Sequence, residues 1–327
     1  MLTRFRVSEC VVRNAASRGA ARRRTLVRRA GLRGAAGGVL ALLLALAGCK
    51  SATTPAINPT VIDTYPAWSP DGRTIAFTRS VKEVWTVDVA SGSVTKLADG
   101  VLPAWSPDGT RLSYLNRGRL YTRTMATGDT SSVLINGRYP THDAAWSRVA
   151  FGRGSNVLGD TLNGIWLIGD TIATPRQVFR ADDATLADIN MLAWSPADST
   201  IAFMSHVIEG AEEIYLFHLR DSSLVLLTSG ALLNRDPAWS PDGRSIAWAR
   251  ASAGDTNPAS GIWVMDQDGL HQRHVVSGGV KETTALSPAW SPTGQQIVYS
   301  GYNDDSDTFT LWVVNADGTA KHQVTRP

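Results

Sequence analysis

The sequence contains six versions of one short segment, and its clearest copy is PAWSPDGRSIAW at residues 237–248. The other copies are PAWSPDGRTIAF (66–77), PAWSPDGTRLSY (103–114), AAWSRVAF (144–151), LAWSPADSTIAF (192–203) and PAWSPTGQQIVY (288–299). Their tryptophans are Trp68, Trp105, Trp146, Trp194, Trp239 and Trp290, which lie 37, 41, 48, 45 and 51 residues apart. A period of roughly 20 to 50 residues is typical of repeat architectures. The repeats therefore predict a single closed domain built from similar units.

Each repeat has the pattern of four short strands. In the first copy, Ala67 and Trp68 end one strand, and residues 69–72 (SPDG) suit a type I turn followed by a residue with positive φ. The next strand alternates, so that Ile75 and Phe77 share one face and Ala76 takes the other. The third copy lacks four residues before Phe151, which predicts a rebuilt turn there.

A second aromatic series marks a third strand in each repeat, and turns such as residues 267–269 (QDG) lead to a fourth. This series consists of Trp85, Tyr121, Trp166, Tyr215, Trp263 and Trp312. Four strands repeated six times predict an all-β fold, a six-bladed β-propeller of four-stranded antiparallel blades over residues 65–327. Because a buried aromatic ring removes about 150 to 250 Å² from water, we interpret the first tryptophan series as core between blades, not as a ligand cage.

The repeat resembles that of the TolB family of periplasmic proteins. The resemblance rests on AWSPDG followed by IAF, and on IWVM followed by DG, and it extends over about residues 65–327. It implies a TolB-like six-bladed propeller. TolB also has an N-terminal α/β domain, whereas only a short tether precedes the first repeat here, so we expect a stand-alone lipoprotein without that domain.

The first 48 residues have the composition of an export signal. Ten of the 32 basic residues and one of the 29 acidic residues lie there, followed by an apolar run that ends in Leu46-Ala47-Gly48-Cys49. A basic region, an apolar region of about a dozen residues and small residues before a cleavage point form a secretory signal. A cysteine at that point resembles the bacterial lipobox, so we expect a signal peptide at residues 1–48 and lipidation of Cys49. Residues 49–64 read as a flexible tether, and Lys50 favours the outer membrane.

The remaining chain is acidic, with 22 basic and 28 acidic side chains. Nucleic-acid binding needs clusters of Lys and Arg, so we do not expect a nucleic-acid partner. We expect a monomer on the periplasmic side of the envelope, bound to the membrane through its lipid.

The longer predicted loops all lie on one face of the ring, between the second and third strands and between successive repeats. Binding residues concentrate on loops held by a rigid scaffold, so we expect the site on this face. The candidates are the residues just before each first strand, at the channel mouth: Asp63, Tyr65, His142, Asp143, Asn190, Arg235, Asp236 and Glu282.

Few residues suggest catalysis or metal binding. The acidic run at residues 303–307 lacks the order of a calcium loop. His142 with Asp143, and His206 with Glu209, could supply metal ligands if the fold brought them together. The chain also lacks a Gly-x-Ser-x-Gly motif for a serine hydrolase. We therefore predict no catalytic residue, no metal and no cofactor.

The main hypothesis is a non-catalytic binding module in the cell envelope for a protein, peptide or glycan. The alternative is a metal-dependent carbohydrate-active enzyme that uses the propeller channel, because similar repeats occur in oligogalacturonate lyases. A bound divalent metal that is lost on His142→Ala would favour the enzyme.

Overall fold

The computed structural model describes residues 61–154, 162–169, 172–181, 186, 188–206, 211–230, 233–251, 260–277, 285–303 and 308–326. All of them belong to one compact unit, Thr54–Pro327. The predicted signal peptide, Cys49 and nearly all of the tether lie outside the described residues, as do Glu209, Glu282 and residues 304–307. No helix among the described residues is long and apolar enough to cross a membrane.

The described residues form 24 β-strands and no helix. The first twelve are β1 Asp63–Trp68, β2 Thr74–Arg79, β3 Glu83–Asp88, β4 Val94–Asp99, β5 Val101–Trp105, β6 Arg111–Asn116, β7 Arg119–Thr124, β8 Thr130–Leu134, β9 Arg138–His142, β10 Arg148–Arg153, β11 Gly164–Gly169 and β12 Ile172–Arg180. The others are β13 Ile189–Trp194, β14 Thr200–His206, β15 Glu212–His218, β16 Leu224–Leu226, β17 Leu233–Trp239, β18 Ser245–Ala251, β19 Gly261–Asp266, β20 Arg273–Ser277, β21 Ala285–Trp290, β22 Gln296–Asn303, β23 Thr308–Asn315 and β24 His322–Gln323.

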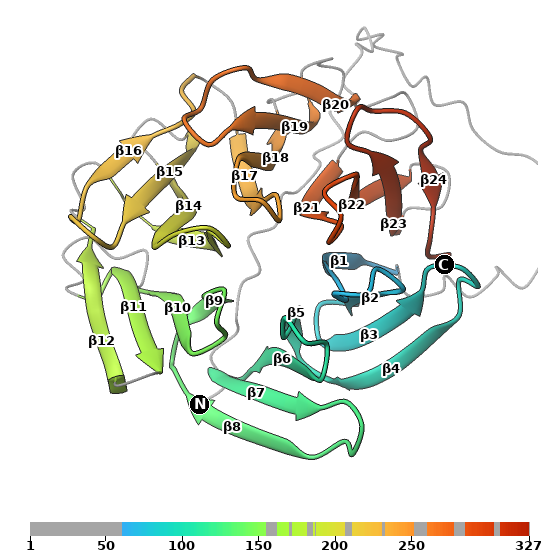
Figure 1. Cartoon of the computed structure of the whole chain (residues 1–327), viewed down its shortest axis with the longest axis horizontal. Helices are drawn as coiled ribbons and strands as arrows, with labels where there is room; N and C mark the ends of the chain where they lie inside the picture. The colour runs from blue at the N-terminus through green and yellow to red at the C-terminus, as the bar shows by residue number, and fades with distance from the viewer. Residues whose placement is uncertain are drawn as a thin grey trace, which may run out of the picture. The chain divides into compact units, whose positions relative to one another are not determined.

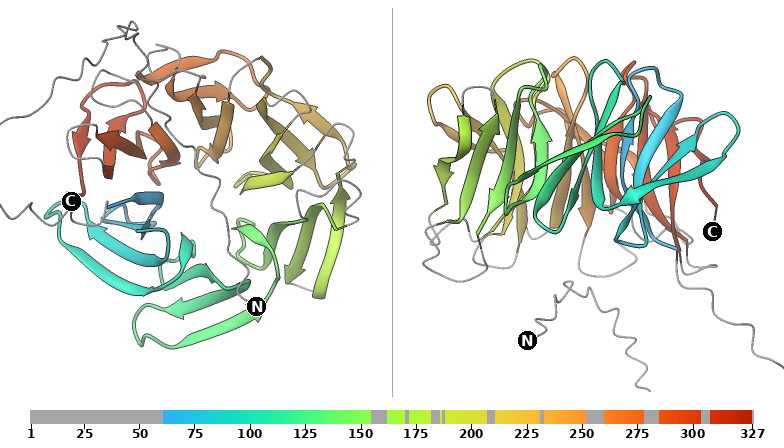
Figure 2. Two further views of the ribbon diagram at one scale, coloured as in Figure 1. Left: turned by 180° about the vertical axis from the view of Figure 1, so that it is seen from behind. Right: turned by 90° about the horizontal axis from the view of Figure 1, so that it is seen from below.

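The strands form antiparallel sheets arranged around a common centre (Figure 1). Four sheets have four strands each: β1–β4, β5–β8, β9–β12 and β21–β24. The fifth sheet has eight strands, in which β13–β16 and β17–β20 are two antiparallel halves joined by one parallel pair, Glu212 with Leu233. The strands thus fall into six sets of four, namely β1–β4, β5–β8, β9–β12, β13–β16, β17–β20 and β21–β24. The first strand of each set lies innermost (Figure 1). Seen from the side, the strands run between two faces of the ring (Figure 2).

The strand ends lie on two opposite faces of the ring (Figure 2). The tight turns from each inner strand to the next strand, such as residues 69–72, lie on what we call the turn face. The ends of β14 and the starts of β15 and β17 lie together on the opposite face, which we call the loop face.

The hydrophobic core lies between neighbouring sets of strands. Ile75 and Phe77 of β2 pack with Val298 and Leu311 of β22 and β23, whereas Ala76 packs on the other side against β6. Each of the other clusters also joins two neighbours, for example β10 and β11 with β13–β15. The predicted alternation in the second strand is therefore confirmed. Since large apolar side chains are buried between sets, each set depends on both neighbours for its stability.

The same kind of packing joins the first set to the last. Trp68 is buried in the cluster that joins β1–β3 to β22–β24. Val61 accepts a hydrogen bond from the Phe309 backbone (3.0 Å), and Ile62 forms a parallel bridge with Phe309. Residues ahead of β1 therefore pair at this seam, while β24 completes its own sheet by pairing with β23.

The third repeat differs from the sequence interpretation. His142 ends β9, and Trp146 donates its backbone N–H to Asp143 (2.9 Å), as Gly72 does to Ser69. Residues 139–151 (YPTHDAAWSRVAF) are therefore the full-length copy, with His142 at the usual tryptophan position and Trp146 at the usual glycine position. The expectation of a shortened turn was wrong. It aligned Trp146 with the repeated tryptophan because residues 144–146 (AAW) resemble PAW, whereas the equivalent position is His142, four residues earlier.

Candidate functional site

A cavity of about 530 Å³ lies at the centre of the ring, and all six inner strands line it. Its wall is made mainly from the repeated Pro-Ala-Trp segment, including Trp105, Trp239 and Trp290. The turn prolines Pro196, Pro241 and Pro292 also contribute, which places the cavity toward the turn face. A concave site of this size with a largely apolar wall and few polar groups is typical of ligand-binding sites.

The first tryptophan series thus has two roles. Trp68 and Trp194 are buried in the clusters between sets, as predicted. Trp239 and Trp290 donate their indole N–H groups to backbone carbonyls of the preceding inner strand, at 3.1 and 3.2 Å. Because these residues also line the cavity, the prediction that they serve only as core was incomplete.

Each inner strand contains a β-bulge just before its Pro-Ala-Trp segment or the equivalent. At each bulge one residue has a positive φ between 50° and 57° although it is not glycine. We call these six residues the bulge ring: Tyr65, Leu102, Tyr139, Met191, Asp236 and Ser287. All six line the cavity.

The bulge-ring residues have a strained backbone, and their side chains differ from one repeat to the next. A left-handed conformation costs an ordinary L-residue about 1 kcal/mol, and such strain tends to collect at functional sites. The flanking Pro, Ala and Trp positions change little between repeats, whereas the ring position holds aromatic, aliphatic, acidic and hydroxyl side chains. The chemistry of the cavity is therefore set mainly at this position.

Three members of the bulge ring act on one another although they come from β1, β9 and β17. The rings of Tyr65 and Tyr139 lie 6.5 Å apart, centroid to centroid. Burial raises the pKa of both phenols, and the nearby charge of Asp236 raises each pKa further. Tyr65, Tyr139 and Asp236 thus bring three polar side chains into one largely apolar cavity.

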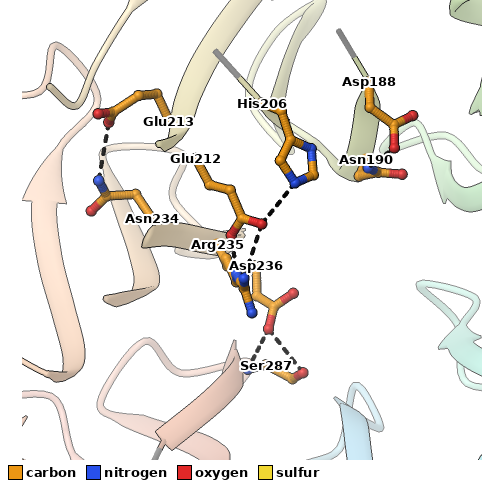
Figure 3. Close-up of polar contacts among 9 residues, drawn as sticks. All are labelled: Asp188, Asn190, His206, Glu212, Glu213, Asn234, Arg235, Asp236 and Ser287. Atoms are coloured by element: carbon orange, nitrogen blue, oxygen red, sulfur yellow. Dashed lines mark hydrogen bonds and ion pairs between the residues drawn. The ribbon is translucent and has the colours of Figure 1, made fainter. Parts of the chain in front are cut away.

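Asp236 is the acidic member of the bulge ring. Its Oδ2 accepts hydrogen bonds from the backbone N–H and the hydroxyl of Ser287, at 2.8 and 3.1 Å. Its Oδ1 is buried and has no hydrogen-bond partner among the described residues. Burial is the main reason why the pKa of Asp236 is raised. In Figure 3 the second oxygen points away from Ser287 and toward the middle of the ring.

A separate charged network lies on the loop face (Figure 3). Glu212 accepts a hydrogen bond from Arg235 Nη2 at 2.9 Å and also contacts Arg235 Nε. His206 Nε2 lies 2.9 Å from the same carboxylate. The hydrogen bond to Glu212 is the main reason why the pKa of His206 is raised, and the bonds from His206 and Arg235 lower the pKa of Glu212 despite its burial.

Glu213, the residue after Glu212, is also buried. Among the described residues, its carboxyl is hydrogen-bonded to neutral side chains and forms no ion pair. It accepts hydrogen bonds from Thr228 (2.6 Å) and Asn234 (3.0 Å), and Asn234 in turn accepts one from the Trp248 indole (3.0 Å). Burial raises the pKa of Glu213. These contacts fix β15 against β17 and β18, so we assign Glu213 a structural role.

The structure places the predicted site residues in several separate environments. Tyr65 and Asp236 line the cavity, whereas Arg235 belongs to the network on the loop face. Asp63 is fully buried and paired twice with Arg79, at 2.7 Å for each contact. Asn190 is buried and donates to Asp188 at 2.8 Å. The set therefore does not form a single site, and Glu282 lies outside the described residues.

His142 and Asp143 lie at the turn end of β9, not ahead of it. Asp143 accepts hydrogen bonds from the Ser147 and Arg148 backbones (2.8 and 3.0 Å) and so closes the turn. Burial lowers the pKa of His142 to about 3, and its Nε2 bonds to the Ser113 hydroxyl at 2.9 Å. The expectation that these two residues ring the channel mouth on the loop face was wrong, because it rested on the displaced copy of the motif.

The remaining histidines are dispersed. His218 bonds to Thr200 (2.9 Å), His271 to Asp266 (2.6 Å) and His274 to the Ser260 carbonyl (3.2 Å). Among the residues that the structure describes, no group of three or more His, Cys, Asp or Glu side chains is arranged to hold a metal ion.

Sequence reasoning found two of the six bulge-ring residues, Tyr65 and Asp236, and missed Leu102, Tyr139, Met191 and Ser287. A signal for the whole ring was present. In five copies the bulge-ring residue directly precedes the proline of the motif. The residue type at this position varies between copies that are otherwise similar. Proline disfavours helical conformations in the preceding residue, but it does not by itself predict a bulge.

Comparisons with known proteins agree with this architecture. No family model matches the sequence. The chain is 30% identical to a TolB homolog of Chlorobaculum tepidum over 122 residues, which is 36% of this chain and 25% of the relative. The chain thus spans about a quarter of the length of the curated TolB homologues that it matches.

Two solved structures share the fold. A putative TolB from Agrobacterium tumefaciens matches with a TM-score of 0.59 and 20% identity, covering 74% of this chain and 88% of that one. An oligogalacturonate lyase in complex with manganese matches with a TM-score of 0.57 and 16% identity, covering 83% of this chain and 80% of that one. Since both identities are low, the likeness concerns the fold. The chain is an all-β protein with a TolB-like β-propeller fold.

Proposed function

We propose that this protein is a non-catalytic binding module of the cell envelope, and that its central cavity receives a segment of a peptide or protein. The observation that carries the proposal is the bulge ring. Six strained residues of different chemistry line one cavity inside a framework that otherwise repeats.

The proposal includes a count of six blades. The two halves of the eight-stranded sheet each contain four strands, an inner strand and a bulge, as the four separate sheets do. In the part of the chain that the structure describes, the backbone pair Glu212 with Leu233 is the one ladder contact that links the two halves into one sheet. We therefore count β13–β16 and β17–β20 as two blades.

A peptide suits the cavity better than a flat protein surface. The wall presents indole rings and prolines, which offer large apolar area with little conformational freedom to lose on binding. A volume of about 530 Å³ falls within the usual range for sites that enclose a small ligand or a few side chains. Tyr65, Tyr139 and Asp236 add the few polar groups that orient such a ligand.

A photo-crosslinking residue at position 102 tests the proposal. Leu102 belongs to the bulge ring, and Leu270 is exposed (58%) in the β19–β20 turn and serves as the control. We expect position 102 to capture a defined peptide from native envelopes and position 270 to capture none of it. The captured sequence, made as a synthetic peptide, should bind the protein in calorimetry and should bind a Trp239→Ala variant at least about ten-fold more weakly, as expected for loss of an aromatic anchor. Equal capture at both positions, or unchanged affinity in the variant, would contradict the proposal.

We further propose that the module is exported and anchored by lipid at Cys49, on the periplasmic side of the envelope and preferentially in the outer membrane. The signal-like composition of residues 1–48 supports this. Mass spectrometry of the N-terminal peptide from native membranes should find a lipid on Cys49, and Cys49→Ala should release the protein from the membrane fraction. An unmodified cysteine would contradict the anchor.

The alternative function is a metal-dependent lyase, and it is favoured by the match to the manganese-bound oligogalacturonate lyase. Elemental analysis of the protein purified without chelators tests it. A stoichiometric divalent metal, together with cleavage of oligogalacturonate that the metal restores after removal, would favour the enzyme over the binding module.

A further inference from the structure

We propose that Asp236, Tyr65 and Tyr139 form a receptor for a cationic group, the ammonium or guanidinium of a lysine or arginine side chain on the entering peptide. This inference rests on the proposed function and specifies the chemistry of the same cavity.

Among the described residues, the Asp236 carboxyl is hydrogen-bonded through one of its two oxygens. Ser287 satisfies only Oδ2, and Oδ1 is buried without a partner among the described residues. A buried polar atom without a partner is costly, and a buried charge is costlier still. A cation at Oδ1 would supply the missing partner and balance the charge.

Arg235 is next to Asp236 in sequence, but its guanidinium is bonded to Glu212 on the loop face. Glu212 also contacts His206, so two basic groups already gather around that carboxylate (Figure 3). Asp236 is thus the carboxyl of the cavity that still has a free oxygen for a cation from a ligand.

Two phenol rings lie in the same cavity as Asp236. Tyr65 and Tyr139 both line the cavity, and the charge of Asp236 acts on both of them. Aromatic faces attract cations that have lost part of their water, so a cavity that combines a carboxylate with two phenol rings is a suitable environment for an ammonium group. The cation would lie between the two rings and Oδ1, while the rest of the peptide lies along the indoles and prolines nearer the turn face.

The test uses n-butylammonium as a mimic of the lysine side chain and n-butanol as its neutral counterpart. Both are titrated into the whole protein at neutral pH while the indole N–H signals of Trp105, Trp239 and Trp290, which line the cavity, are followed by NMR. We expect saturable shifts with butylammonium at concentrations at least about ten-fold lower than with butanol, because a charge-assisted bond adds that much affinity. Equal affinities, or no shift with either compound, would overturn the inference.

Asp236→Asn identifies the group responsible. The asparagine oxygen can still accept the Ser287 bonds, but the charge is gone, so we expect the preference for butylammonium to disappear while butanol binding stays. Asp221→Asn, in an exposed turn, is the matched control and should keep the preference. A preference that survives in Asp236→Asn would overturn the inference.

A pH titration of the wild-type protein gives the same information without a variant. Because the pKa of Asp236 is raised, its charge is lost at a higher pH than for an ordinary aspartate as the solution is acidified. We expect butylammonium affinity to fall through that range and butanol affinity to stay constant. If both fall together, the cavity is changing shape and the inference fails. If the crosslinking experiment identifies a peptide without lysine or arginine, the inference also fails while the binding function stands.

Discussion

At the scale of single residues, the third repeat shows how one exchange is accommodated. His142 replaces the usual tryptophan, and Trp146 takes the position that glycine has in most other turns, with φ of 55°. The two rings pack at 4.4 Å, and Arg111 lies over Trp146 at 4.8 Å. The indole lost at one position is thus partly restored four residues later, at the cost of backbone strain.

Substitutions at Trp146 should reverse the usual order of alanine and glycine. Both variants lose the contacts with His142 and Arg111, but only glycine relieves the left-handed conformation. We expect Trp146→Gly to be more stable than Trp146→Ala by about 1 kcal/mol in denaturant unfolding. Alanine equal to or better than glycine would show that the turn does not adopt this conformation in solution.

His206 should make the stability depend on pH. Its pKa is raised above its ordinary value of about 6.5 by Glu212, so its contribution is complete below that pH and is lost as the pH rises through the raised value. Relative to wild type, His206→Gln should therefore gain stability as the pH rises from about 6 to 8. The change should stay below about 1 kcal/mol because the imidazole is 39% exposed. A difference between the two proteins that does not vary with pH would contradict this assignment.

At the scale of elements, the turns could be predicted from the sequence and the bulges could not. In three copies, a serine hydroxyl donates to the turn aspartate at 2.6 Å, and that aspartate accepts a backbone N–H. These contacts are local, so residue type and spacing predict them. The bulges at Asp236 and Ser287 depend on how the six inner strands pack around the central cavity. That packing involves residues far apart in the sequence, so no local pattern specifies it.

The sixth copy has Thr293 in place of the turn aspartate and a longer hydroxyl contact, 3.2 Å from Ser291. Thr293→Asp should restore the charge-assisted bonds of the other copies and stabilise the protein by about 0.5 kcal/mol at pH 7. The pKa of the equivalent Asp242 is lowered, chiefly by Ser240, so this gain should disappear when acid protonates the new carboxyl. Thr293→Asn is the control without charge, and a gain that persists at low pH would contradict the electrostatic explanation.

At the scale of the whole molecule, the sequence predicted the fold class and the repeat positions because the pattern recurs. It did not predict the site. The expectation of a site on the loop face took the first tryptophan series as core alone, whereas Trp105, Trp239 and Asp236 line one cavity once the ring closes. Residues from distant repeats converge through closure, which spacing along the chain does not reveal.

Because each cluster joins neighbouring sets, the ring should unfold as one unit. Phe77 is fully buried at the seam between the first and last sets. Phe77→Ala should cost about 3 to 5 kcal/mol and lower the melting temperature of the entire protein in a single calorimetric transition. Val133→Ala, at an exposed outer-strand position, should change stability by less than about 0.5 kcal/mol. A second, separate transition in Phe77→Ala would mean that the sets unfold independently.

The central claim is that the ligand occupies the cavity lined by the repeated motif and not the loop face. Calorimetry with the peptide captured through position 102 tests it most directly, using one variant for each location. Ala238→Trp fills the cavity without altering a loop, and His206→Gln alters the loop face without reaching the cavity. We predict that Ala238→Trp abolishes binding and that His206→Gln leaves the affinity unchanged. Binding that survives Ala238→Trp and is lost in His206→Gln would contradict the claim.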